Sequence, residues 1–105
     1  MFTVLVSIQV KSEYVKAFIA ATIEETRASL QDPGVVQDDF LQESDDAAHF
    51  ILHEVFQTRA IGLQHLEMAH FKQWQTRIKP MLVEPPHAVT YEHVFPKSKA
   101  KNSYV

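Results

Sequence analysis

HFILHEVF, residues 49–56, decides the fold because it is apolar on both of its faces. Side chains alternate between the two faces of a strand. One face carries Phe50, Leu52 and Phe56, and the other carries Ile51 and Val55. A strand that is buried on both faces needs cover on both sides of its sheet. The stretch therefore predicts a central strand.

The rest of the chain supplies three more strands and two helical regions. Strand alternation is found in FTVLVSIQV (residues 2–10), VVQDDFLQE (35–43) and HAVTYEHVF (87–95). Apolar residues recur at helical spacing over 12–30 and, with a break, over 58–78. The order β-α-β-β-α-β is typical of the ferredoxin-like α+β fold, in which both helices cover one face of an antiparallel sheet.

The other face of such a sheet is bare, although the central strand predicts that it is covered. A chain of 105 residues also buries a modest share of its surface by itself. A second copy packed sheet against sheet answers both needs. We therefore expect a homodimer that forms through the open sheet face, as a dimeric α/β barrel.

Composition excludes several classes of protein. The net charge is −3, from 10 basic and 13 acidic residues, which does not favour binding to nucleic acid. The basic residues Lys97, Lys99 and Lys101 cluster at the C-terminus, so we expect one domain over 1–105 with a flexible basic tail at about 97–105. Cysteine is absent, which removes disulfides and thiolate chemistry. No stretch has the pattern of a signal peptide or a membrane span, so we expect a cytoplasmic protein without a membrane partner.

Two histidines stand close together in HLEMAHFKQW, residues 65–74. On a regular helix, His65 and His70 would point about 140° apart, and no HExxH motif accompanies them. We therefore expect no metal site. A helix break near Met68 and Ala69 would still allow the two rings to converge.

His65 and Glu54 are the candidate catalytic residues. His65 is either a core-edge histidine bonded to a carbonyl or a general base, since imidazole titrates near neutral pH. Glu54 interrupts an apolar face, and a buried carboxylate needs a partner or a shifted pKa. It is either part of a structural ion pair or the group that orients a histidine, His65 or His70.

Aromatic residues follow the histidines and recur in the last strand. Phe71 and Trp74 have the spacing of core residues on a helix, and Tyr91 and His93 share one face of the last strand. If these faces line a cleft under the helices, all four belong to a substrate pocket. The two glycines form no phosphate-binding loop, so we expect no cofactor. An apolar pocket with histidines suits proton abstraction from a small carbonyl or phenolic substrate.

The region from FILHEVF to HFKQW resembles the signature of the antibiotic biosynthesis monooxygenase domain family. In that family a glutamate ends an aromatic strand, a histidine follows about eleven residues later, and a His-aromatic pair comes five residues further on. Glu54, His65, His70 and Phe71 stand at these positions. The resemblance covers about 2–95 and implies a dimeric ferredoxin-like α+β barrel.

The resemblance also implies an activity. Some members of the family oxidise quinols or polyketide anthrones with molecular oxygen and without metal or flavin. By that comparison His65 is the base, Glu54 orients it and His70 completes the catalytic group. Another branch isomerises the phosphorylated autoinducer-2 signal, which requires cations such as Lys72 or Lys79 near the pocket. The sequence thus predicts a cofactor-independent monooxygenase, with such an isomerase or a non-catalytic ligand-binding dimer as alternatives.

Overall fold

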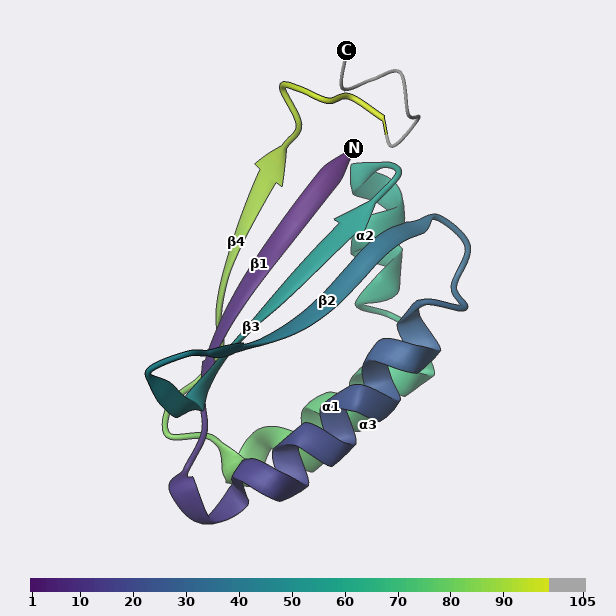
Figure 1. Ribbon diagram of the computed structural model, residues 1–105. Coiled ribbons are helices and arrows are strands. Elements are labelled where there is room, and N and C mark those ends of the chain that lie inside the picture. Colours follow the sequence, from purple (N-terminus) through teal and green to yellow (C-terminus); the bar gives the residue numbers. More distant parts are fainter. Residues whose placement is uncertain (99–105) are drawn as a thin grey trace.

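Strand β3 (Asp46–Phe56) is an inner strand of a four-stranded antiparallel sheet in the computed structural model, which describes residues 1–98. The strand order is β2-β3-β1-β4. β1 (Phe2–Gln9) and β2 (Val35–Glu43) flank β3, and β4 (His87–Glu92) pairs with the far side of β1 (Figure 1). This arrangement confirms the predicted ferredoxin-like α+β fold.

Two strand boundaries differ from the prediction by more than one residue. β3 starts at Asp46 rather than at residue 49, because its pairing with β2 continues up to the turn, where Glu43 lies opposite Asp46. β4 ends at Glu92 rather than at residue 95. Glu92 pairs with Phe2, the first residue of β1, so no neighbouring strand is left to pair with beyond it.

All the helices lie on one face of the sheet (Figure 1). α1 (Val15–Ser29) follows a short 3₁₀ turn and packs against α3 (Ala69–Ile78). α2 (Arg59–His65) is a separate helix beside β3. It begins after Thr58, whose hydroxyl accepts a hydrogen bond from the backbone N–H of Ile61 at 3.2 Å.

Aromatic side chains pack where α1 and α3 lie against the sheet. The ring of Phe18 on α1 lies 5.0 Å from that of Phe50 on β3. Trp74 on α3 is buried, and its indole N–H donates to the Thr22 hydroxyl on α1 at 3.1 Å. This bond gives the buried indole N–H a partner and fixes α3 against α1.

The pairing register assigns each face of the sheet. Val4 lies opposite Glu54 on β3 and Thr90 on β4, so these three side chains share the helix-side face. Leu5 lies opposite His53 and Val89, which therefore point to the open face. Of the sets predicted for β3, Phe50, Leu52 and Phe56 face the helices, whereas Ile51 and Val55 face away.

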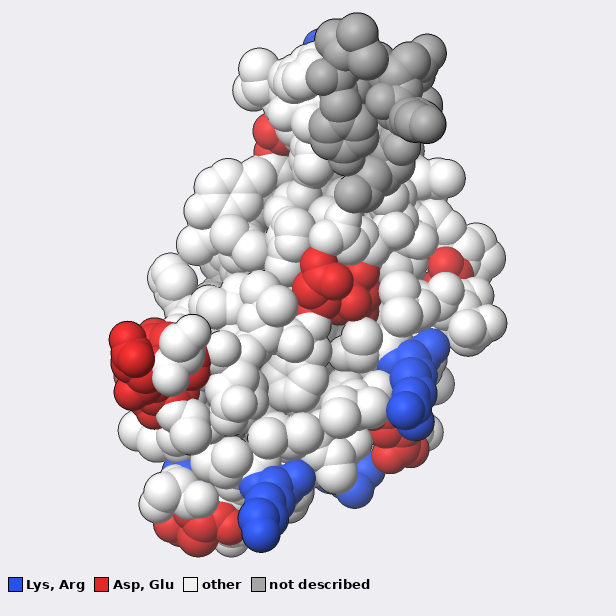
Figure 2. All heavy atoms as spheres, viewed as in Figure 1, with Lys and Arg blue, Asp and Glu red and all other residues white. Residues whose placement is uncertain are grey.

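Charge is unevenly distributed over the face seen in Figure 2. Most lysine and arginine side chains visible there lie over the helix layer, and a group of acidic side chains interrupts an otherwise uncharged area higher up. Most of the predicted basic tail, 97–105, lies outside the residues that the structure describes. Within 1–98 no helix has the length and apolar character needed to cross a bilayer.

Candidate functional site

A cavity of about 840 Å³ lies between the helix-side face of the sheet, α2, α3 and the segment 82–86. Its wall is mainly apolar and includes Phe2, Val4, Val6, Leu52, Phe56, Leu66, Phe71, Trp74, Ile78 and Leu82. Glu54 and His65 are the two ionisable residues of the wall that are buried. The cavity is large enough for a small aromatic molecule and offers it one polar corner.

His65 is the last residue of α2 and is 3% exposed. Its ring packs between Phe56 and Phe71, with ring centres 5.4 Å and 5.2 Å away. Neither ring nitrogen has a hydrogen-bond partner in the structure. Burial lowers the pKa of His65 below its usual value, although Glu25 and Asp32 oppose that change. The imidazole is therefore neutral at pH 7 and free to accept a proton.

Glu54 approaches His65 from β3. One carboxylate oxygen, Oε2, lies 3.5 Å from His65 Nε2. Burial, followed by the charges of Asp38 and Glu25, raises the pKa of Glu54 to about 8. Glu54 is therefore mostly protonated at pH 7 and is ready to share or release a proton when the charge of its neighbour changes.

His70 stands beside His65 but does not line the cavity. Its Nδ1 lies 2.8 Å from Glu25 Oε1, and its Nε2 lies 2.7 Å from Asp32 Oδ2. Burial acts against the charged form, but the hydrogen bonds to Glu25 and Asp32 prevail and raise the pKa of His70. His70 is thus held by two carboxylates, whereas His65 has no hydrogen bond.

The structure brings together the three residues that were predicted to be catalytic. The predicted break lies between the end of α2 at His65 and the start of α3 at Ala69, and it turns the ring of His70 toward His65. The ring centres are 5.6 Å apart. Glu54 contacts His65 and not His70, so of the two possible partners it is placed to orient His65.

Two of the four residues predicted for the pocket line the cavity. Phe71 and Trp74 belong to its wall, but Tyr91 and His93 do not. In β4 the side chains that face the cavity are Ala88 and Thr90, so alternation turns Tyr91 to the open face. His93 comes after β4 and pairs with Thr3, also on the open face. The assignment of Tyr91 and His93 to a helix-side pocket was wrong in its choice of strand face.

Sequence reasoning missed three acidic residues that form one cluster of ionisable side chains with Glu54, His65 and His70. Glu25 and Asp38 are each 8% exposed, and Asp32 lies in the loop after α1. Burial and the charge of Glu25 raise the pKa of Asp38 to about 7. Glu25 could have been found, since it continues the buried stripe of α1 that runs through Thr22. Asp32 gives no comparable signal, because an Asp-Pro-Gly sequence is typical of any turn.

Fold and site together define a small ferredoxin-like α+β domain with an apolar cavity and a histidine–carboxylate corner. Residues 1–77 match the family model of the antibiotic biosynthesis monooxygenases. The chain therefore belongs to the antibiotic biosynthesis monooxygenase family, which associates it with oxidation of the monooxygenase type.

Solved structures agree with this assignment. A candidate antibiotic biosynthesis monooxygenase from Nitrosomonas europaea is 32% identical, with a TM-score of 0.88 over 90% of this chain and 100% of that chain. Two further candidates, from Bacteroides thetaiotaomicron (22% identity, TM-score 0.83, 95% of each chain) and Deinococcus radiodurans (15%, 0.84, 89% and 92%), share the fold. None of the curated proteins compared with the chain matches it significantly in sequence.

Proposed function

We propose that this protein is a cofactor-independent monooxygenase that oxidises a small quinol, phenol or polyketide-like substrate with molecular oxygen. The observation that carries the proposal is His65, a buried and neutral imidazole on the wall of an apolar cavity, with Glu54 directly beside it. An apolar chamber disfavours charge, so a base held there is available to a bound substrate and shielded from water.

The proposed reaction begins with transfer of an acidic proton from the substrate to His65. The resulting anion is electron-rich and supplies the electrons that reduce oxygen. For a substrate with a CH₂ group flanked by aromatic rings, one oxygen atom becomes the new carbonyl oxygen and the other leaves as water with the two hydrogens. The imidazolium then returns its proton to the oxygen atom that leaves as water, and Glu54, 3.5 Å from His65 Nε2, orients the imidazole during both transfers.

The shape of the cavity supports a flat aromatic substrate. Phe71 and Trp74 form part of the wall next to His65, with ring centres 5.6 Å apart. Ala88 and Thr90 of β4 present small side chains to the cavity, which leaves the space open. A planar ring system can therefore lie against the aromatic residues while its hydroxyl or activated carbon faces His65.

Charge around the cavity argues for the oxygenase over an isomerase of phosphorylated carbonyl compounds. Within 1–98, Lys79 is the single cation in the wall, and Glu84 lies in the same wall. Lys72, the other cation considered for phosphate, lies outside the wall and pairs with Glu67 at 2.8 Å. A phosphate dianion would find little compensation here.

Oxygen uptake by metal-stripped protein offered a panel of quinols and anthrones tests the proposal. We expect uptake in the wild type, and at least a hundredfold slower uptake after His65→Ala or after the more conservative His65→Gln. His87→Ala is the matched control, because His87 is the first residue of β4 and lies on the sheet face away from the cavity. Uptake that is equally fast without His65 would refute the mechanism. Turnover that continues under argon would identify the isomerase instead.

We also propose that the open sheet face forms a homodimer. Leu41, Val89 and Tyr91 are exposed large side chains on that face. Val89→Glu places a charge in the middle of the face and should yield monomers, whereas Val94→Glu, beyond the end of β4, should not. Light scattering after size exclusion distinguishes these results, and a wild-type monomer at micromolar concentration would contradict the proposal.

A further inference from the structure

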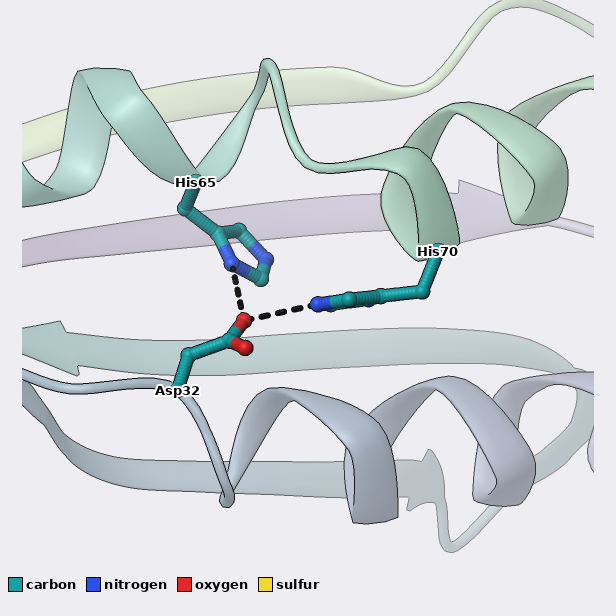
Figure 3. A group of neighbouring side chains, drawn as sticks. All are labelled: Asp32, His65 and His70. Carbon is teal, nitrogen blue, oxygen red and sulfur yellow. Dashed lines mark hydrogen bonds and ion pairs between the residues drawn. The ribbon is translucent and has the colours of Figure 1, made fainter.

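Two histidines and an aspartate from three separate elements converge on one point (Figure 3). His65 ends α2, His70 lies in the first turn of α3, and Asp32 comes from the loop after α1. Asp32 Oδ2 lies 2.7 Å from His70 Nε2 and 3.5 Å from His65 Nδ1. One ligand atom from each residue lies within 4.8 Å of the other two, a spacing that a single ion can bridge.

Each histidine also has a glutamate close to its second ring nitrogen, the one that does not face Asp32. His70 presents Nε2 to Asp32 and places Nδ1 2.8 Å from Glu25. His65 presents Nδ1 to Asp32, and its Nε2 lies 3.5 Å from Glu54. Histidines that bind metals generally donate their second ring N–H to a carboxylate, which fixes the tautomer and the ring orientation. His70 has that arrangement, and His65 has Glu54 close to its second nitrogen, although no hydrogen bond joins them.

The ring of His65 lacks the partners that a buried polar group normally has. It is 3% exposed, and neither of its nitrogens makes a hydrogen bond. Buried side-chain nitrogens are almost always hydrogen-bonded, since an unpaired one loses its hydration without compensation. An ion near Asp32 would coordinate Nδ1 and thereby satisfy one of the two unpaired nitrogens.

The cluster also lacks a fixed positive charge. It contains four carboxylates, Glu25, Asp32, Asp38 and Glu54. The ion pairs that lysine and arginine make within 1–98 involve other residues. A divalent cation beside Asp32 would offset the negative charge of those carboxyl groups that are ionised.

We propose that Asp32, His65 and His70 bind a divalent transition-metal ion of the zinc class. Two imidazole nitrogens and one carboxylate oxygen suit Zn²⁺, Fe²⁺, Co²⁺ or Ni²⁺, whereas Mg²⁺ and Ca²⁺ prefer oxygen ligands alone. The ion takes the place of the proton between His70 and Asp32. His70 is partly exposed, with 27% of its side chain accessible, and provides the path from solvent.

Occupancy of this site and the proposed oxygenase reaction exclude each other. An imidazole coordinated through Nδ1 keeps its proton on Nε2, so His65 has no lone pair left to accept a proton from a substrate. The ion is therefore an inhibitor of the cofactor-independent reaction, and its removal restores the base.

Titration of the untagged, metal-stripped full chain with Zn²⁺ in a calorimeter tests the site without any substrate. We expect one ion per chain. His70→Ala should weaken binding at least tenfold, and Glu25→Gln, which removes the charge behind His70, by roughly tenfold. His87→Ala is the control for adventitious binding to a surface histidine and should bind as the wild type does. Co²⁺ should produce visible absorption bands that disappear in His70→Ala.

Three results would overturn the proposal: well under one ion per chain, unchanged affinity in His70→Ala, or equal loss in His87→Ala. Circular dichroism of each variant shows whether it is folded. If His70→Ala does not fold, Asp32→Asn provides the same test from the loop after α1. Absence of Zn²⁺ binding together with oxygen uptake that depends on His65 would reject the metal site and leave the oxygenase intact.

Discussion

Replacement of Glu54 by glutamine should remove a large part of the pH dependence of stability. Glu54 is buried on β3 beside His65, and burial together with Asp38 and Glu25 raises its pKa to about 8 from the usual 4.5. The folded chain therefore retains a proton on this carboxyl that the unfolded chain loses. Glutamine has nearly the same shape as the protonated side chain and cannot ionise.

The sign and size of the effect follow from this difference in pKa. A raised pKa in the folded state stabilises the protein fully below pH 4.5, and the contribution is lost as the pH rises toward 8. Between about pH 5 and pH 8, the Glu54 carboxyl is largely ionised in the unfolded chain but still mostly protonated in the folded chain. Glu54 alone then reduces the free energy of unfolding by about 3 kcal/mol over this interval.

Urea unfolding at a series of pH values measures this quantity, with the single tryptophan, Trp74, as the fluorescent probe. The protein concentration is kept constant because a dimer would make stability depend on it. A chelator removes metal ions that would compete with protons in the cluster. Glu54→Gln should be close to the wild type at pH 5 and more stable than the wild type by about 3 kcal/mol at pH 8.

Glu13→Gln is the matched control, because Glu13 is exposed in the turn before α1. Its stability curve should run parallel to that of the wild type. The reasoning is refuted if the wild-type and Glu54→Gln curves also run parallel between pH 5 and pH 8. Some loss of stability with rising pH should remain in Glu54→Gln, since Asp38 has a pKa raised to about 7.

Three further results are expected. Gly34→Ala should lower the free energy of unfolding by about 2 kcal/mol in urea, because Gly34 has φ of 83° and an added Cβ would lie 2.6 Å from Ile61. Thr22→Val should cost about 1–3 kcal/mol by leaving the Trp74 N–H unpaired, whereas Thr22→Ser keeps the hydroxyl and should cost less. In the oxygen-uptake assay, kcat/KM should decrease toward acidic pH, and the midpoint of this decrease should lie below pH 6.5. The reason is that burial lowers the pKa of His65, the base that must be neutral.

The architecture was predictable because local pattern and tertiary packing agree. Strand alternation around Phe50 and helical spacing around Phe18 identify the residues that meet in the core. A polar partner for Glu54 was likewise expected, because a carboxylate on an apolar strand face requires one, but the pattern left His65 and His70 as equal candidates. In each case the apolar pattern along the chain and the final packing point to the same face.

The face of β4 could not be predicted in this way. The face of β4 that includes Tyr91 carries the larger side chains and has the composition of a pocket wall. The other face, with Ala88 and Thr90, does not. Pattern rules assume that the larger apolar residues point into the protein. Here the helix side of β4 borders a cavity and not a packed core, so small residues face inward and Tyr91 remains on the open face.

The convergence of the two histidines depends on a break that helix propensity alone argues against. Leu66, Glu67 and Met68 are good helix formers, yet Met68 has extended backbone angles of −66° and 138° and packs against the core. A continuous helix would set His65 and His70 about 140° apart and leave Asp32 with one of them at most. Core packing of Met68 thus outweighs local propensity. Whatever the cluster binds, a proton or a metal ion, depends on this three-residue interruption.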